Sequence, residues 1–446
     1  MKFIIENIGS IEKAEIELNN LSIICGENDS GKTTIAKVVY AVGQASSFFA
    51  TDYQLKKYDK FRSIYDALSL YVRRISQIDF PVEDSLIELI EKLQITVLHL
   101  RRTADVNSID VDLISSLIDN ILFLIKEDEN KEFKEEYKDD FDKISKIKDL
   151  LNDQYQNLEK EPIQDFIFQA LKSEFSNDLL YKKEGVKKAS LSFYDEGEEV
   201  FSLDFNNKKV LKYSTSNNLP IKDSTLIDGP YVFQISQIIH RISTINTVRR
   251  RNNFELNLPY HVIDLCSKID GSKNITDEIG SNCNWDSSGF YKGFMDFNTE
   301  SRSFELFQEK KSYTANNVSS GMKSIAIVDL LYKGRFINKD SILIIDEPET
   351  NLHPKWQKLY AQAIVSLANQ GTNILINTHS PYMLEALKIY SDKEKLKGTK
   401  FYFTSKEEDK SIINDTNGNI NPIIEALSEP LYSLMGAHPR FCVTAI

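Results

Sequence analysis

Three groups of residues in this chain have types and spacing that suit phosphate binding and the activation of water. The first is Gly26-Glu27-Asn28-Asp29-Ser30-Gly31-Lys32-Thr33, which fits the phosphate-loop pattern G-x-x-x-x-G-K-[ST]. Backbone amides of such a loop wrap the phosphates of a nucleotide, Lys32 would reach the β- and γ-phosphates, and Thr33 would give a hydroxyl to Mg²⁺. The alternative is a chance match in an irregular loop. The residues expected to contact ATP here are Gly26, Asn28, Ser30, Gly31, Lys32, Thr33 and Thr34.

The second group is a pair of carboxylates that follows an apolar run. Ser341 to Ile345 predict a buried strand, and Asp346 and Glu347 come directly after it. Asp346 would hold Mg²⁺ together with Thr33, and Glu347 would accept a proton from the attacking water. Paired acids after a strand also occur as simple helix caps, which is the alternative interpretation.

The third group contains a histidine and a serine–glycine segment. His379 follows a second predicted strand, at the edge where nucleotides bind in parallel α/β sheets, and is expected to donate to the γ-phosphate. Ser319, Ser320 and Gly321 precede a predicted helix and would face a nucleotide bound by a second copy of the chain. The alternative for the serines is an ordinary helix N-cap. The remaining histidines, His99, His240, His261, His353 and His438, show no comparable setting.

The elements that must position these residues alternate between strand and helix. Three short strands are predicted in residues 1–25, with a helix from Thr34, helices through 53–182, hairpins through 188–213 and a mixed segment over 235–310. From Ser319 the pattern predicts a helix to Tyr332, then the strand that ends before Asp346, a helix 354–369, a strand 373–377 and a helix 382–390. This alternation predicts an α/β fold with a parallel sheet covered on both faces.

Composition narrows the functional classes. The 446 residues carry a formal net charge of −12, which argues against a generally basic nucleic-acid-binding surface. Cys25, Cys266, Cys283 and Cys442 are scattered without metal-binding spacing and are expected to be structural in a reducing cytoplasm. No secretory leader and no apolar run of about 18 residues is present, so we expect a cytoplasmic protein without a membrane contact.

In this order, the motifs resemble those of ABC ATPases of the SMC, Rad50 and OLD branch. The resemblance implies a Walker A loop at Gly26 to Thr33, a signature at Ser319 to Gly321, Walker B acids at Asp346 and Glu347, a D-loop near 351–353 and a switch histidine at His379. It also implies a Q-loop glutamine, for which Gln234 is the candidate. The signature reads Val-Ser-Ser-Gly-Met where transporter-type proteins have Leu-Ser-Gly-Gly-Gln.

The resemblance implies an ABC-type nucleotide-binding domain with an antiparallel β subdomain and a large helical insertion. The expected boundaries are 1–50 for the Walker A part, 51–185 for the insertion, 186–234 for the antiparallel part, 235–310 for a mixed region and 311–446 for the part with the signature, Walker B and the switch histidine.

The stretch Asp346 to Pro354 is similar to that of OLD-type and related prokaryotic defence ATPases. This likeness implies an ATPase subunit of an antiviral system, like those of Septu (PtuA-like) or PARIS (AriA-like), that regulates a separately encoded effector nuclease. Some 55 residues follow the helix predicted near Tyr390, too few for the Toprim nuclease domain of OLD proteins. The alternative is a Rad50/SMC-like ATPase for DNA repair or maintenance. A transporter subunit is disfavoured, because some 285 residues separate Thr33 from Ser319.

The expected partners are a second copy of the chain, which forms a homodimer through the nucleotide sites, with a higher oligomer also open, and the effector protein. DNA or RNA contact is a further expectation, through Arg241 and Arg249 to Arg251 or through the effector. The alternative for this cluster is a surface helix whose arginines pair with nearby acids.

Overall fold

The computed structural model divides the chain into two compact units, Met1–Ser47 with Gln164–Ile446, and Phe48–Ile163. The structure describes residues 1–45, 68, 70–71, 85, 87–93, 111–127, 135, 138–158, 163–215, 219–235, 258–272, 293–298, 301, 303–308, 311–407 and 410–434. The arginines of the predicted basic cluster, as well as Cys283 and Cys442, lie outside these residues.

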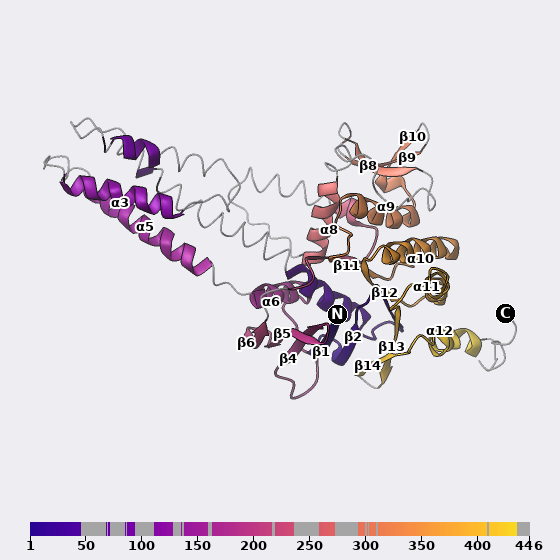
Figure 1. The fold of residues 1–446 in the computed structure, drawn as a ribbon. Coiled ribbons are helices and arrows are strands. Elements are labelled where there is room, and N and C mark those ends of the chain that lie inside the picture. The colour runs from indigo at the N-terminus through magenta and orange to yellow at the C-terminus, as the bar shows by residue number, and fades with distance from the viewer. Residues whose placement is uncertain are drawn as a thin grey trace. The chain divides into compact units, whose positions relative to one another are not determined.

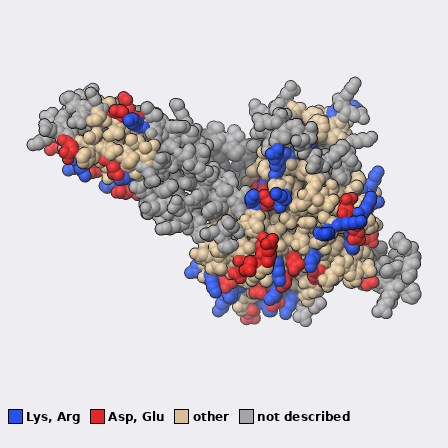
Figure 2. Space-filling view, viewed as in Figure 1, with Lys and Arg blue, Asp and Glu red and all other residues tan. Residues whose placement is uncertain are grey.

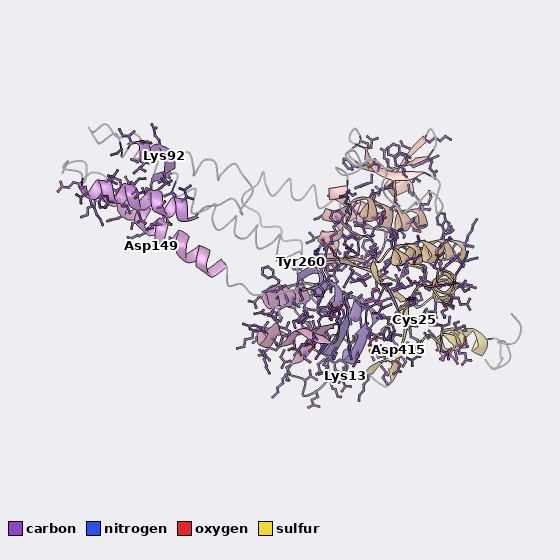
Figure 3. The ribbon with its side chains drawn as sticks, in the orientation of Figure 1. Lys13, Cys25, Lys92, Asp149, Tyr260 and Asp415 are labelled. Carbon is purple, nitrogen blue, oxygen red and sulfur yellow. The ribbon has the colours of Figure 1, made fainter. Side chains whose placement is uncertain are left out.

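The larger unit is built on a six-stranded sheet in the order β14-β13-β3-β12-β11-β7. Its strands are β3 (Leu21–Gly26), β7 (Asp223–Ile227), β11 (Ser341–Asp346), β12 (Asn373–Thr378), β13 (Lys400–Glu407) and β14 (Lys410–Asp415). All neighbouring pairs are parallel except β13 with β14. Every residue of β3, including Cys25 labelled in Figure 3, is buried, as a strand covered on both faces requires. Because these strands are parallel, the carboxyl ends of β3, β11 and β12 lie at one edge of the sheet. Figure 1 labels β11 and β12.

The larger unit also contains helices, and two of them begin at a side chain that caps the first turn. The helices are α6 (Ile163–Glu174), α8 (Tyr260–Gly271), α9 (Ser320–Lys333), α10 (Pro354–Asn369), α11 (Pro381–Lys393) and α12 (Asn421–Leu434), and residues 32–45 are also helical. In both α10 and α11 a proline occupies the first turn, and the side chain before it, His353 or Ser380, accepts a backbone hydrogen bond. Both helices therefore start directly after the loops that leave β11 and β12.

A second sheet, antiparallel and in the order β2-β1-β4-β5-β6, belongs to the same unit. Its strands are β1 (Lys2–Ile8), β2 (Ile11–Glu17), β4 (Ala189–Asp195), β5 (Glu198–Phe205) and β6 (Val210–Thr215). Alternate residues are buried along β1 and β4, and the rings of Phe3 and Phe193 pack with centroids 4.7 Å apart. On the face seen in Figure 2, acidic and basic side chains are interspersed, and pairs such as Lys13 with Glu6 form ion pairs.

A small antiparallel sheet precedes the signature segment. It contains β8 (Phe294–Asn298), β9 (Ser303–Gln308) and β10 (Lys311–Thr314), with β9 in the middle, and the short 3-10 helix η4 (Ala315–Asn317) connects it to α9. The buried side chains of Phe304 and Leu306 belong to the same apolar core as α9 and β11. This sheet is therefore anchored to the part of the unit that contains α9 and β11.

The smaller unit contains α3 (Val111–Glu127) and α5 (Lys138–Leu158), which pack on each other. Apolar residues at helical spacing, such as Ile114, Ile118 and Ile121, are buried. Lys148 donates to Asp119 across the pair. The large apolar side chains of Leu113, Phe123 and Leu150 remain 45%, 63% and 53% exposed.

Most predicted elements are confirmed, and two expectations are corrected. The α/β fold, the first three strands, the hairpins and the elements from Ser320 to Lys393 agree with the sequence interpretation. The helix near Tyr390 is not the last one, because β13, β14 and α12 follow it. The segment 186–234 is not wholly antiparallel, because β7 pairs parallel with β11. No described helix is long and apolar enough to cross a membrane.

Candidate functional site

The phosphate loop lies between β3 and the helix that starts at Lys32. Gly26 is packed so closely on β13 that an added Cβ would lie 2.0 Å from the Thr404 carbonyl oxygen. Gly31 has φ +93°, a conformation that side chains rarely adopt. The Ser30 hydroxyl lies 2.6 Å from that of Thr404 and donates to the Glu27 carbonyl. Backbone geometry therefore explains why the loop needs glycine at both positions.

Lys32 is buried inside this loop. Its ammonium donates to the carbonyl oxygens of Gly26 (2.9 Å) and Glu27 (2.6 Å). Burial lowers the pKa of Lys32, and the nearby carboxylates of Glu347 and Asp346 act in the opposite direction. A phosphate brought to the loop would replace neutral carbonyl acceptors with anionic ones, which bind an ammonium more strongly.

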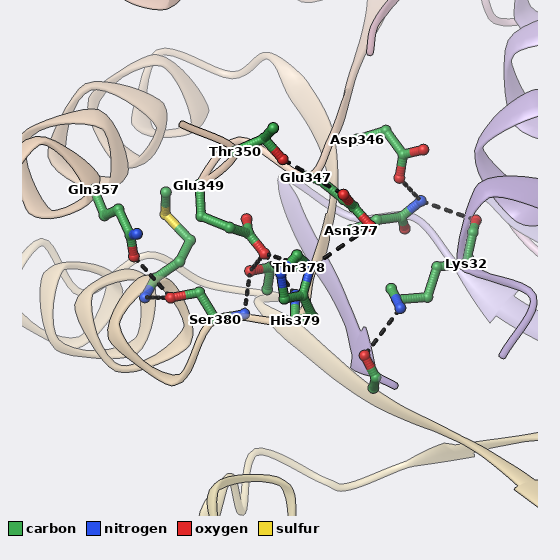
Figure 4. A network of polar contacts seen from close by, with 12 residues as sticks. Lys32, Asp346, Glu347, Glu349, Thr350, Gln357, Asn377, Thr378, His379 and Ser380 are labelled. Atoms are coloured by element: carbon green, nitrogen blue, oxygen red, sulfur yellow. Dashed lines mark hydrogen bonds and ion pairs between the residues drawn. The ribbon is translucent and has the colours of Figure 1, made fainter. Parts of the chain in front are cut away.

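Thr33 and Asp346 meet at the edge of the sheet, as the sequence predicts for two magnesium ligands. Thr33 Oγ1 donates to Asp346 Oδ2 at 2.8 Å. Asn377 Nδ2 donates both to Asp346 Oδ1 and to the Lys32 carbonyl, each at 2.8 Å, and so connects the two motifs (Figure 4). Burial raises the pKa of Asp346, while the hydrogen bonds from Asn377 and Thr33 lower it. A hydroxyl and a carboxylate converging here are the oxygen ligands that Mg²⁺ prefers, so the residues fit that ion.

Glu347 leaves β11 in a left-handed conformation, with φ +51°. Its backbone N–H donates to the Asn377 carbonyl at 2.9 Å, which fixes the turn against the end of β12. The side chain is 39% exposed, and Thr350 Oγ1 lies 3.4 Å from Glu347 Oε2. An accessible carboxylate beside the Thr33–Asp346 pair suits a general base that acts on water.

His379 lies beside two carboxylates at the end of β12. Its Nδ1 is 3.2 Å from Glu349 Oε1 and 3.6 Å from Glu347 Oε1 (Figure 4). Neither of these two contacts is a hydrogen bond. Nδ1 is buried without a hydrogen-bond partner among the described residues. The ring as a whole is 40% exposed. The structure therefore joins His379 to Glu347, two residues that the sequence placed in one site.

The signature segment begins α9. Ser319 is the exposed N-cap residue, but its side chain makes no capping hydrogen bond. Ser320 Oγ donates to the Asn351 carbonyl at 3.0 Å, and a Cβ on Gly321 would lie 3.1 Å from Leu352 and 3.3 Å from Trp356. The segment therefore packs on the predicted D-loop of the same chain, and the Ser319 hydroxyl makes no cap contact.

The remaining predicted contacts are dispersed. Asn28 is exposed at the tip of the loop, and the Thr34 hydroxyl lies 3.0 Å from that of Ser10. Gln234 is exposed on a short helical turn after β7. Three residues earlier, Tyr231 hydrogen-bonds Asp228 and experiences the charge of Asp346. The structure thus brings the segment before Gln234 near the site, while no described contact joins the Gln234 side chain to it.

Three residues of the site had no role assigned from the sequence. Asn377 and Glu349 lie within segments that drew attention for His379 and Glu347, and their position at the strand ends was the available signal. Thr404 gave no local signal, because it contacts Ser30 from 374 positions away. His261, expected to lie in an ordinary setting, instead lies between Glu174 and Asp228.

The chain was compared with protein families, curated proteins and solved structures. The family described as "AAA ATPase domain" matches residues 1–384. No curated protein matches the chain. Among solved structures, the SMC head domain from Thermotoga maritima is 10% identical with a TM-score of 0.37, and the match covers 93% of this chain and 98% of that chain. An SMC head bound to the C-terminal winged-helix domain of ScpA is 11% identical with a TM-score of 0.40, covering 93% and 96%.

Proposed function

We propose that this chain, which belongs to the AAA ATPase domain family, binds ATP with Mg²⁺ and hydrolyses it to ADP and phosphate. The observation that carries the proposal is the 2.8 Å contact between Thr33 Oγ1 and Asp346 Oδ2, beside the buried ammonium of Lys32. A hydroxyl and a carboxylate that are 313 positions apart in the sequence converge beside the phosphate loop, which is the arrangement expected of two ligands of one ion.

Each residue then has one task. Thr33 and Asp346 would hold Mg²⁺, which neutralises charge on the phosphates. Lys32 would exchange its carbonyl partners for phosphate oxygens, Glu347 would accept a proton from the attacking water, and His379 would donate to the transferred phosphate. Asn28, Ser30 and Thr34 belong to the loop and to the first helical turn, where backbone amides face the phosphates.

Binding is tested first with Lys32→Ala. Because this change deletes the charge directed at the phosphates, we expect ATP affinity to fall by at least about tenfold, and turnover to fall with it. Lys37→Ala is the matched control, since Lys37 lies on the same helical segment and donates to the Glu174 carbonyl. Equal ATP affinity in the Lys32→Ala and wild-type proteins, by calorimetry, would reject the assignment.

A composite site across two copies is the finer part of the proposal. Ser319 and Gly321 would contact the nucleotide held by the other subunit, because Ser319 is exposed at the start of α9 with no capping contact. Mixing a Lys32→Ala protein with a Ser319→Arg protein should partly restore turnover, since each mixed dimer retains one intact site. No recovery, with mixed dimers shown to form, would count against sharing.

We further infer that the ATPase is the sensor or scaffold subunit of an antiviral defence complex and regulates a separately encoded effector nuclease. The support is the likeness of residues 346–354 to defence ATPases and the exposed apolar side chains of the smaller unit, of which Phe123 is the most exposed. Copurification of neighbours from the native operon, with and without ATP, tests this role.

Two variants of the smaller unit, one at Phe123 and one control at Lys92, make the copurification experiment more specific. Phe123→Asp should weaken capture of the effector, whereas Lys92→Ala, which removes one exposed charge from the same unit, should not. If the chain alone degrades nucleic acid, or no neighbour copurifies with any nucleotide, the division of labour is wrong. Capture of DNA alone would favour the repair alternative.

A further inference from the structure

Glu349 is a buried carboxylate at the centre of the candidate site. Its side chain is 4% exposed. Oε1 accepts hydrogen bonds from the His379 backbone N–H at 2.6 Å and from Thr378 Oγ1 at 2.8 Å. Oε2 is buried without a hydrogen-bond partner among the described residues. Figure 4 shows the carboxylate beside the His379 ring.

Such an arrangement is costly for stability alone. A buried carboxylate loses its hydration, and an oxygen without a partner does not recover that loss. A neutral side chain could accept the same two hydrogen bonds at Oε1 with less desolvation. The carboxylate therefore serves something other than the fold of this loop, and the Nδ1 atom of His379 lies 3.2 Å from it.

The ring of His379 has two carboxylates to choose from. Nδ1 is closer to Glu349 Oε1, at 3.2 Å, than to Glu347 Oε1, at 3.6 Å. A proton on Nδ1 that went to Glu347 would occupy the oxygen needed for the attacking water. A ring nitrogen that faces carboxylates carries a proton. Donation from Nε2 to a phosphate then uses the doubly protonated ring, in which both nitrogens are donors.

We propose that Glu349 is a positioning residue that holds His379 through both its backbone N–H and its Nδ1–H, and so keeps Glu347 free to act on water. This inference rests on the proposed ATPase function. A small rotation of the imidazole would complete the Nδ1–H hydrogen bond to Glu349. On the far side, Ser380 Oγ donates to Gln357 at 2.7 Å, so the His379 loop is also tied to α10.

The kinetic test is a double-mutant cycle. Glu349→Gln keeps the size and an oxygen acceptor but removes the charge. We expect kcat to fall about 10- to 100-fold, the range seen when groups that orient site residues are changed, with KM for ATP nearly unchanged. Because Glu349 acts through His379, Glu349→Gln added to His379→Ala should cause no further loss. Glu174→Gln, another buried carboxylate beside a histidine, should leave kcat unchanged.

Full additivity in that cycle, or an unchanged kcat in Glu349→Gln with its fold verified by circular dichroism, would overturn the proposal. A second readout does not depend on turnover. In ¹⁵N spectra of histidine-labelled protein without nucleotide, the neutral His379 ring should carry its proton on Nδ1, and Glu349→Gln should lower that population. A wild-type ring protonated on Nε2 would also overturn it. If the protein fails to hydrolyse ATP, the proposed function fails while the tautomer still decides the role of Glu349.

Discussion

His379 and His261 both lie beside two carboxylates, yet their surroundings differ in every other respect. The His379 ring is 40% exposed and its Nδ1 makes no well-formed hydrogen bond. The His261 ring is 4% exposed, with Nδ1 2.6 Å from Glu174 Oε2 and Nε2 3.0 Å from Asp228 Oδ2. The His261 backbone N–H also donates to Glu174. One histidine has hydrogen-bonding capacity to spare, and the other has none.

The two settings suit different roles. The His379 side chain is accessible to a ligand, whereas the His261 side chain connects parts of the fold. Burial acts to lower the pKa of His261, but hydrogen bonds with Asp228 and Glu174 outweigh it and raise the pKa to about 9. Because both ring nitrogens are bonded, the His261 ring cannot turn toward a ligand without breaking these contacts, and it ties α6 and α8 to the segment after β7. Unsatisfied groups next to an accessible carboxylate, as at His379, are the pattern of a working site.

Among the variants that test this comparison, the largest expected change is in kcat. Glu347→Gln should lower kcat by about 10²- to 10⁴-fold with ATP binding retained, because the amide cannot accept a proton from water. Glu174→Gln makes the same chemical change beside His261 and should leave kcat near the wild-type value. Phosphate release and calorimetric binding give the two readings. Near wild-type hydrolysis by Glu347→Gln would remove that residue from its role.

The free energy of unfolding should respond in the opposite order, with a larger effect from a change at His261 than from a change at His379. His261→Ala removes the partner of Glu174, a carboxylate with 0% side-chain exposure, and should cost about 3–5 kcal/mol in the free energy of unfolding. His379→Ala should cost less than about 1 kcal/mol, since the ring is half-exposed and weakly bonded. Urea denaturation measures both. Equal losses in the two variants would mean that burial does not distinguish the clusters.

The pH dependence of protein stability gives a further test of the role of His261. The folded-state pKa of His261, about 9, lies above the value of 6.5 for an unperturbed histidine, so the folded protein binds this proton more tightly. The resulting stabilisation is complete below pH 6.5 and is lost as the pH rises through 9, by up to about 3 kcal/mol. The wild-type protein should therefore lose more stability between pH 6.5 and 9 than His261→Ala does. Parallel pH profiles would contradict the assignment.

The smallest effect is expected where the two regions approach each other. Tyr231 hydrogen-bonds Asp228, the partner of His261, and experiences the charge of Asp346. Tyr231→Phe should cost about 1 kcal/mol of stability and leave kcat nearly unchanged, because Asp228 retains His261. A large loss of turnover in Tyr231→Phe would show that the cluster around His261 also affects the site of Glu347 and His379. The two regions would then not have separate roles.

The sequence predicted best what local chemistry demands. The residues of the loop from Gly26 to Thr33 follow one another in the sequence, and so do the two acids after β11. Each group could therefore be recognised from its local spacing, together with the strand before it. Glu349 and Asn377 depended on which strand ends become neighbours. Thr404 depended on a parallel pairing between β13 and β3, which leaves no periodic mark in either segment. His261 was missed because its partners, Glu174 and Asp228, come from distant elements.

The central place of β3 has a consequence for the order in which the protein matures during synthesis. β3 leaves the ribosome long before its two neighbours in the sheet, which are residues 373–378 and 400–407. At about 5–20 residues per second, roughly 20 to 75 seconds pass before either neighbour exists. During that interval the apolar run of β3 has neither of its neighbouring strands to pair with. β3 can therefore take its place in the sheet only after residues 373–378 and 400–407 have been made.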